Sequence, residues 1–523
     1  MSTLLLLAPL LVLVLGAIVI LLVDAIYLAA GKKAGSLVKA VHAQEGPADG
    51  SAGGPAWALE RSAAAAVFFA VAFILSLIFL LEGYAGPGGP ILAGSLRFDT
   101  LALTGFLLVT LGGGMASLMA GGYFHELKAD HGGFHPLLLL SAAGAMILVA
   151  SADLITFFVG LETMSLAAYA MTGFRIVSPR SVEGAMKYFL LGSFASALML
   201  YGMALLYGES GSIDLEVIGR ALTGPAAQSP LAVLGSILVL AGLLFKIAAV
   251  PFHMWTPEAY QGAPTPATGF MATVVKAAAF IALLRILGTV MTDPALAGPP
   301  FGWATILSMV CVVTMFWGNL AALKQKNIKR MLAYSSIAHA GYILIGVIAG
   351  WVYPAAVGRA QWAMPPVVSA SIVYYLAAYV AANAGAFAVV AIACKGGGEA
   401  TDIEDYRGFG RHHPLLALAL SICLLSLLGM PPLGGFFGKL YVFRLALDGN
   451  LWLLAVLGMI ASVVSAYYYL GVIVVMYMKE KEDAAEAAAP IRSGQMAVAI
   501  ILAVLLVLAL GLAPSPVLSL ILG

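Results

Sequence analysis

Four ionisable side chains interrupt long apolar runs of this chain. They are Lys246 in LAVLGSILVLAGLLFKIAAVPFH, Glu162 in SADLITFFVGLETMSLAAYAMTGF, Lys276 in FMATVVKAAAF and Lys439 in GGFFGKLYVF. A charged group at membrane depth costs about 3 kcal/mol on insertion scales, so such residues are rare and usually mark an ion or proton pathway. We therefore interpret the four as steps of one proton route.

The pairing of one acid with one base has a direct chemical use. A lysine can carry protons only if its surroundings weaken the ammonium form, and desolvation in an apolar interior does this. A nearby carboxylate has the opposite effect, so changing the separation of Glu162 and Lys246 would change the lysine's affinity for a proton. A static ion pair is the alternative for one isolated buried pair. The further lysines in the apolar runs lack matching acids, which favours proton transfer.

Lys276 and Lys439 extend the predicted route away from Lys246. Lys276 follows the segment YQGAPTPATGF, and we expect it to receive a proton from Lys246 through water. Lys439 follows the proline and glycine pairs of GMPPLGGFFGK, and it suits proton release on the outer side. Each is a single cation in an apolar run, which again indicates function.

Two histidines near the apolar runs each have two interpretations. His253 is either an intermediate on the route or an interfacial histidine, because imidazole suits both roles. His339, in SSIAHAGYIL, either bridges Lys276 and Lys439 or packs through hydrogen bonds. Both histidines therefore stay candidates for the relay.

Two other cations lie close to the ends of their apolar runs. Lys187, in VEGAMKYFLLG, either extends its long side chain to the interface or pairs with Glu162. Arg285 lies nine residues beyond Lys276, and we expect it to anchor the outer end of its helix. Lys187 is kept as a weaker relay candidate, whereas Arg285 is not.

The overall composition is that of a membrane protein. Of 523 residues, 62% are hydrophobic and only 10% are charged, whereas a soluble domain carries roughly 25% charged residues. The formal net charge of +1 gives no sign of a nucleic-acid partner. We therefore predict an all-α polytopic protein whose main surroundings are the lipid bilayer.

Patterns that bind cofactors are missing from the sequence. The cysteines, Cys311, Cys394 and Cys423, are far apart and form no C-x-x-C pair, which argues against iron–sulfur, zinc and disulfide frameworks. The Gly-rich pieces GGGMASLMAGG and KGGGEATD lack a strand context and a lysine at P-loop spacing. We predict no cofactor, metal ion or redox centre in this chain.

Fourteen apolar runs are long enough to cross a bilayer, which needs about 20 residues each. They lie near 3–28, 63–83, 101–122, 135–151, 153–173, 183–207, 231–252, 265–290, 302–323, 329–350, 366–394, 413–443, 451–477 and 493–513. With the N-terminus outside, seventeen Lys and Arg residues fall in cytoplasmic loops and four in outer loops. The positive-inside rule therefore predicts that both termini lie outside.

Prolines interrupt the seventh and the twelfth span. Pro251 follows Lys246, and Pro431 and Pro432 precede Lys439. Such breaks at corresponding positions of two halves indicate an inverted-repeat transporter. We predict N-terminal helices over 1–134 with a cytoplasmic loop at 29–62, five-helix repeats over 135–290 and 301–480, and a last helix within 481–523.

Four segments of the chain resemble the antiporter-like membrane subunits of respiratory complex I (NADH:quinone oxidoreductase). They are VGLETMSLAAYAMTGF, LLFKIAAVPFHMWTPEAYQGAPTPATGFMATVVKAA, GNLAALKQKNIKRMLAYSSIAHAGYILIG and LSLLGMPPLGGFFGKLYVF, and the similarity covers roughly residues 135–480. The GFFGK context of Lys439 is most similar to the subunit N branch of bacteria, whereas subunit M usually carries glutamate there.

The resemblance implies a fold and a set of roles. It implies fourteen helices with two inverted five-helix units, and proton translocation driven by redox chemistry elsewhere. Glu162 would modulate Lys246, Lys276 would connect the two halves, and Lys439 would be the terminal site. NADH, FMN, iron–sulfur clusters and quinone would belong to partner subunits, and this chain would contact a neighbouring antiporter-like subunit and small membrane subunits.

Three other functions compete with this interpretation. An Mrp-type cation/proton antiporter subunit would share the fold and the pairing of lysine with glutamate. A structural scaffold with inert lysines would leave pumping unchanged when Lys246 is replaced. Direct quinone catalysis by this chain is disfavoured, because the sequence carries no redox group or nucleotide motif.

Overall fold

The computed structural model describes residues 3–30, 57–83, 91–92, 94–127, 132–298, 302–356, 365–395, 398–479 and 488–522. The helices are α1 (Thr3–Leu6), α2 (Ala8–Ala30), α4 (Trp57–Leu81), α5 (Thr100–Glu126), α6 (Phe134–Ala150), α7 (Leu154–Thr172), α8 (Pro179–Ser210), α9 (Leu215–Ala221), η2 (Ala226–Gln228), α10 (Pro230–Lys246), α11 (Trp255–Gly262), α12 (Thr265–Phe270), η3 (Met271–Val275), α13 (Lys276–Thr289), α14 (Pro294–Ala297), α15 (Trp303–Ala322), α16 (Ile328–Ala356), α17 (Pro366–Ile392), η4 (Ile403–Tyr406), α18 (Phe409–His412), α19 (Pro414–Leu428), α20 (Gly434–Asp448), α21 (Trp452–Met478), α22 (Gly494–Leu512) and α23 (Pro514–Leu522).

The apolar runs form helices because a bilayer offers the backbone no hydrogen-bond partners, and an α-helix satisfies its own. Eleven described helices are long and apolar enough to cross a membrane, so the chain is a multi-pass membrane protein. Shorter apolar helices, α6, α10 and α19, occupy the fourth, seventh and twelfth predicted spans. The all-α class is confirmed, while the count of fourteen crossings stays a prediction.

Local signals set several helix boundaries. The Asp153 carboxylate accepts the backbone N–H of Thr156 at 2.8 Å and thereby caps α7, because a carboxylate suits the free N–H groups of a first turn. The predicted division between the fourth and fifth spans is confirmed at this point.

The predicted loop at 29–62 is shorter than expected, since α2 continues to Ala30 and α4 begins at Trp57. Residues 31–56 lie outside the described residues.

Both helix interruptions predicted from proline are confirmed. Helix α10 ends at Lys246 and α11 begins at Trp255, with Pro251 between them. Helix α19 ends at Leu428 and α20 begins at Gly434. Proline lacks the backbone N–H that the next helical turn would need, so each helix stops before it.

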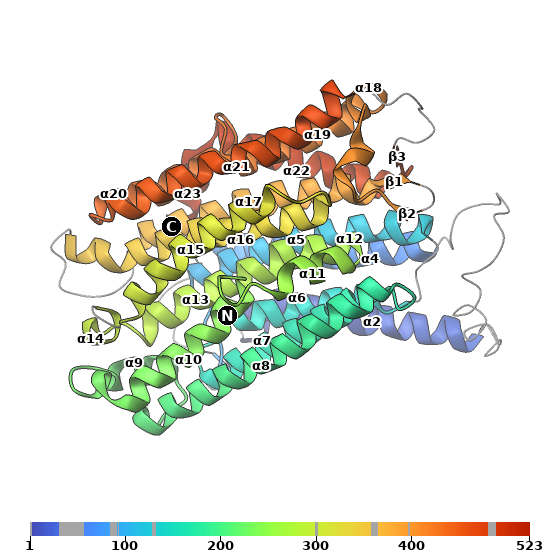
Figure 1. Cartoon of the computed structure of the whole chain (residues 1–523). Coiled ribbons are helices and arrows are strands. Elements are labelled where there is room, and N and C mark those ends of the chain that lie inside the picture. Colours follow the sequence, from blue (N-terminus) through green and yellow to red (C-terminus); the bar gives the residue numbers. More distant parts are fainter. Residues whose placement is uncertain are drawn as a thin grey trace.

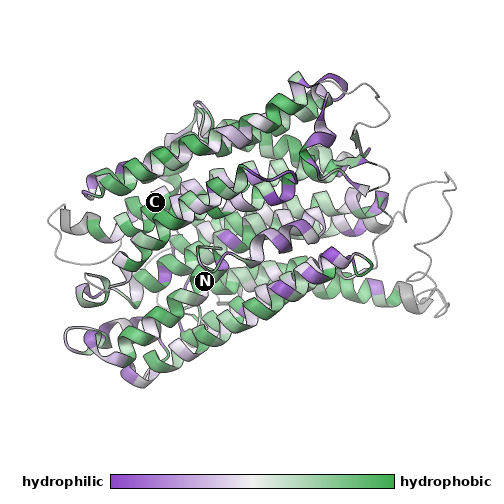
Figure 2. Cartoon of the chain, viewed as in Figure 1, coloured by the Kyte–Doolittle hydropathy of each residue, from purple (hydrophilic) through white to green (hydrophobic). Residues whose placement is uncertain are grey.

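The helices run side by side as a bundle (Figure 1). Burial is greatest in three central spans. The buried share of the 18-residue apolar stretch is 100% in Thr265–Thr289, 94% in Ile328–Val352 and 94% in Pro366–Ile392, against 33% in Leu59–Leu81. Lys276 and His339 therefore lie on central helices. The outer helices expose aliphatic side chains, as lipid-facing helices do, and hydrophobic residues predominate along the bundle (Figure 2).

A three-stranded sheet, absent from the predictions, lies at one end of the bundle. Its order is β2 (Gly398–Glu399), β1 (Ala393–Lys395) and β3 (Ala489–Pro490), and both pairings are antiparallel. We call this the sheet end; α9 and α14 lie at the opposite end, the α9 end (Figure 1). The strands are too short to carry an alternating apolar pattern, so no pattern in the sequence predicts them.

Candidate proton-transfer site

Lys246 is the last residue of α10 and is 2% exposed. Its Nζ donates to Ser165 Oγ at 2.7 Å and to Tyr169 Oη at 3.0 Å, both on α7. Because the helix ends here, the ammonium extends toward α7 from the start of the proline break. The break therefore presents a buried cation to hydroxyl groups of a neighbouring helix.

Glu162 lies on α7 and accepts a short hydrogen bond from Ser196 of α8. Among the residues that the structure describes, it forms no direct ion pair with Lys246. Ser165 follows one turn after Glu162, and Tyr169 follows one turn later, so the three share one face of the helix. Lys246 therefore bonds the hydroxyl groups of this face, while Glu162 bonds Ser196 of α8.

Aromatic rings enclose the ammonium of Lys246. Its Nζ lies 5.2 Å from the ring centroid of Tyr169, 5.8 Å from that of Tyr188 and 5.4 Å from that of Phe245. Tyr188 stacks on Trp255 with centroids 4.1 Å apart. Ring faces attract a cation without neutralising it, so they stabilise Lys246 and leave its proton transferable.

Lys276 is the first residue of α13 and follows the π-helical segment Met271–Val275. Its Nζ donates to the backbone carbonyl of Ser336 at 2.5 Å, and Tyr379 Oη donates to Ser336 Oγ at 2.8 Å. Within the described ranges no carboxylate forms an ion pair with Lys276. The π turn widens the helix immediately before this lysine, as is frequent at functional sites.

His339 lies on α16, three residues after Ser336. Its Nδ1 is 2.8 Å from Tyr375 Oη and its Nε2 is 3.2 Å from Tyr469 Oη, with the donors set by the imidazole tautomer. Its ring also contacts Tyr379, at 5.2 Å between centroids, on the side of Lys276. Both of its nitrogens have polar partners, so the geometry suits either a bridge or hydrogen-bonded packing.

Lys439 belongs to α20, just after the second break, and is 6% exposed. Its Nζ donates to the Leu428 carbonyl at 2.8 Å and to Ser462 Oγ at 2.7 Å. The ammonium also lies 4.8 Å from the ring centroid of Tyr342. The Leu428 carbonyl is available because α19 ends there, so the break itself supplies a ligand for the lysine.

A cavity of about 10 Å³ separates His339 from the second break, which is room for roughly one water molecule. It is lined by His339, Tyr375, Ala378, Tyr379, Ser426, Leu427, Gly435 and Gly438. Gly435 lets α20 approach α19 closely, because a Cβ atom there would overlap the Ser426 carbonyl oxygen. Polar groups thus continue from Lys276 through His339 to the helix that carries Lys439.

Two of the weaker candidates lie apart from this arrangement. Lys187 is 45% exposed and pairs with Glu183 one turn earlier on α8, so the expected alternative of pairing with Glu162 is wrong. His253 lies in the first break with its ring 5.9 Å from Trp317, and its Nδ1 has no hydrogen-bond partner among the described residues. Arg285 binds Asp99 through two hydrogen bonds, 2.9 and 2.8 Å long, beside the α9 end.

The hydroxyl partners of the lysines were missed by the sequence analysis. A helical stripe was nevertheless visible in LETMSLAAY, where Glu162, Ser165 and Tyr169 recur at three- and four-residue spacing. The segment YSSIAHAGY has the same spacing and includes Ser336 and His339. Reading hydroxyl residues at helical spacing from each charged residue would have found both groups.

Potential metal ligands lie dispersed in the described part of the chain. No three His, Cys, Asp or Glu side chains lie together there in a way that could hold a metal ion. Cys311, Cys394 and Cys423 are free thiols on separate elements. The site is therefore built from lysines, hydroxyl groups and a histidine.

A helical membrane protein with two broken helices, each presenting a buried lysine to polar groups, has the architecture of the antiporter-like ion translocators. The chain belongs to the NADH:quinone oxidoreductase/Mrp antiporter transmembrane family, whose model matches residues 151–465.

Curated relatives and solved structures agree with this family. NADH-quinone oxidoreductase subunit N 1 of Sorangium cellulosum is 50% identical over 441 residues, covering 83% of this chain and 85% of the relative. Subunit N of Trichlorobacter lovleyi is 43% identical over 391 residues, covering 74% and 76%. A chain of respiratory complex I from Thermus thermophilus, solved with bound aureothin, superposes with a TM-score of 0.73 at 34% identity, covering 98% of both chains.

Proposed function

We propose that this chain is a proton-translocating membrane subunit of an NADH:quinone oxidoreductase (complex I), most similar to subunit N. Relatives that carry this name reach 50% identity and cover most of the chain. The observation that carries the proton role is the set of buried lysines held by hydroxyl and carbonyl groups. Such lysines are stabilised without being neutralised, so each can gain and lose a proton.

The proposed route runs from Glu162 and Lys246 through Lys276 to Lys439. Glu162 moves relative to Lys246 and changes how strongly that lysine holds its proton. Lys276 accepts the proton next, and the groups around His339 lead from there to Lys439. No oxidation or reduction occurs along this route; NADH, FMN, iron–sulfur clusters and quinone belong to partner subunits, whose chemistry supplies the driving force.

The proposed setting is the bacterial inner membrane, with both termini on the periplasmic side. Basic residues of several loops lie together at the sheet end, where Arg175 and Lys329 contact Glu399 and Lys479 contacts Glu404. By the positive-inside rule this end faces the cytoplasm. A neighbouring antiporter-like subunit and small membrane subunits would cover part of the outer helices. The division into inverted repeats over 135–290 and 301–480 belongs to the same proposal.

A subunit of an Mrp-type cation/proton antiporter is the second candidate. The Mrp complex of Dietzia has a chain with a TM-score of 0.74 at 20% identity, a likeness of fold alone. The names of the more similar relatives favour the oxidoreductase. Cation-driven proton exchange by the isolated complex in the absence of NADH would support the antiporter instead.

Proton uptake driven by NADH in inverted membrane vesicles tests the proposed function. At matched amounts of assembled complex, we expect Lys246→Ala to lower uptake about 100-fold, the scale of a lost proton-transfer group. Lys187→Ala is the matched control, because that lysine is exposed and paired on its own helix. Normal uptake by Lys246→Ala would make the lysine structural and the chain a scaffold.

A further inference from the structure

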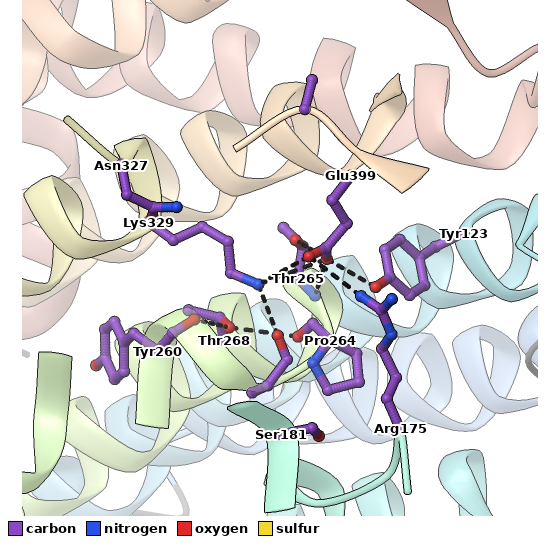
Figure 3. A network of polar contacts seen from close by, with 12 residues as sticks. Tyr123, Arg175, Ser181, Tyr260, Pro264, Thr265, Thr268, Asn327, Lys329 and Glu399 are labelled. Atoms are coloured by element: carbon purple, nitrogen blue, oxygen red, sulfur yellow. Dashed lines mark hydrogen bonds and ion pairs between the residues drawn. The ribbon is translucent and has the colours of Figure 1, made fainter. Parts of the chain in front are cut away.

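Glu399 gathers hydrogen-bond donors from three helices and from the loop between α7 and α8, at the sheet end (Figure 3). Its side chain is only 8% exposed. The donors are Tyr123 Oη (2.7 Å), the backbone N–H of Thr265 (3.1 Å), Thr265 Oγ1 (2.6 Å), Lys329 Nζ (3.3 Å) and Arg175 Nη1 (3.4 Å). A buried carboxylate with this many donors has a defined position and little freedom to move.

The charges around Glu399 keep it ionised. Burial by itself would raise the pKa of this carboxyl, but Lys329, the hydroxyl donors and Arg175 outweigh burial and hold the pKa below its ordinary value. Lys329 is itself fully buried and also donates to the Ala263 carbonyl at 2.6 Å. Glu399 is therefore a fixed anion at neutral pH, and it does not exchange protons with the route.

The helices that Glu399 connects carry the central lysine and its acceptor. Thr265 begins a helix that continues through Met271–Val275 to Lys276, eleven residues later. Lys329 lies in the first turn of α16, seven residues before Ser336. At 1.5 Å per residue these separations are about 16 Å and about 10 Å along the two helix axes. Glu399 thus joins the two helices at their common end.

We propose that Glu399 is a positioning residue for proton transfer: it sets the register of the helix bearing Lys276 against α16, and so the contact between Lys276 and Ser336. This inference rests on the proposed function. The π segment lies between Thr265 and Lys276, and it is a place where a helix can change register. Because Glu399 holds Thr265, a change in the π segment moves Lys276 and leaves the sheet end of the helix in place.

The test replaces the anion and measures protons taken up per NADH oxidised, in vesicles with equal amounts of assembled complex. We expect Glu399→Gln to lower this ratio about ten- to a hundredfold, since misplacing a reacting group by about 1 Å can cost a hundredfold. Glu399→Asp keeps the charge beside Lys329, and we expect it to recover most of the ratio. Glu404→Gln is the control, because that carboxylate also binds basic residues at the sheet end but is exposed.

Each outcome decides the matter. A normal ratio for Glu399→Gln, or equal losses for the Gln and Asp variants, would overturn the proposal. Should Glu399→Gln fail to assemble, Thr265→Val removes one donor and no charge; a reduced ratio supports the proposal and a normal one refutes it. Lys276→Ala is measured alongside. If Lys276→Ala pumps normally, the proposed function itself fails. If Lys276→Ala loses pumping while Glu399→Gln keeps a normal ratio, only the role of Glu399 is refuted.

Discussion

The side chain of Lys439 packs directly against Gly429, across the second helix break. A Cβ atom at position 429 would lie 2.9 Å from Cδ of Lys439 and 3.5 Å from its Nζ. Gly429 also has a φ of +89°, which side-chain-bearing residues adopt at a cost. The break therefore does two things: it frees the Leu428 carbonyl for the ammonium, and it leaves the space that the lysine's methylene groups occupy.

Replacing Gly429 by alanine should displace Lys439. The left-handed backbone alone should cost about 1–2 kcal/mol, and the added methyl group forces the lysine away from Ser462. We expect lower thermal stability of the complex and a several-fold loss of NADH-driven proton uptake. Gly471→Ala is the control, because that glycine lies in helix α21 with nothing within 4 Å of the added atom. Equal behaviour of the two variants would contradict a role for the break in placing Lys439.

Ser165→Ala removes a hydroxyl group to which the Lys246 ammonium donates. The Lys246 ammonium keeps Tyr169 as a partner but loses its 2.7 Å bond to Ser165, and a hydrogen bond to a charged group contributes about 1.5–3 kcal/mol. We expect proton uptake to fall about tenfold while assembly is retained. Ser519→Ala, at an exposed serine near the end of the chain, should pump normally. Unchanged uptake in Ser165→Ala would mean that the hydroxyl is not part of the route.

Neighbouring tyrosines on α17 give a matched test of His339. Tyr375 Oη lies 2.8 Å from His339 Nδ1, whereas Tyr374 Oη donates to the Leu510 carbonyl away from the route. We expect Tyr375→Phe to slow proton uptake several-fold and Tyr374→Phe to affect stability only. Stopped-flow measurement of proton uptake in vesicles would separate the two. If both variants pump at the normal rate, His339 has a packing role.

The Asp99–Arg285 pair should contribute to stability and leave proton coupling unchanged. Burial acts to raise the pKa of Asp99, but Arg285 outweighs it and holds that pKa below its ordinary value. A lowered pKa in the folded state means that the contribution is complete above the ordinary value of about 4 and is lost as the pH falls below it. We expect Asp99→Asn to lower the Tm at pH 7, and the difference from wild type to shrink below pH 4. A changed number of protons taken up per electron transferred from NADH would contradict a purely structural role.

Much of the architecture could be predicted from the sequence. Apolar runs of about 20 residues fixed where helices lie, and Pro251, Pro431 and Pro432 fixed where two of them break. The lysines of the candidate site were found because a charge in an apolar run is conspicuous. The division between the fourth and fifth spans near Asp153 was predicted from the lengths of the apolar runs.

Other features could not be predicted from local sequence. The three-stranded sheet joins residues near 394 with residues near 490, through strands of two or three residues. Glu399 looked like an ordinary loop residue, and its donors come from positions between 123 and 329. Lys187 seemed able to reach Glu162, but the rotation of α8 directs it to Glu183 instead.

The sequence by itself therefore determined which segments are helices, where they break and which charges are buried with them, because hydropathy, proline and charge act within one run of residues. The tertiary structure alone decided what each lysine touches. Lys246 meets Ser165 across 81 positions and His339 meets Tyr469 across 130. Those contacts depend on the rotation and depth of each helix in the bundle, which are set by packing against neighbouring helices and are not encoded in any single segment.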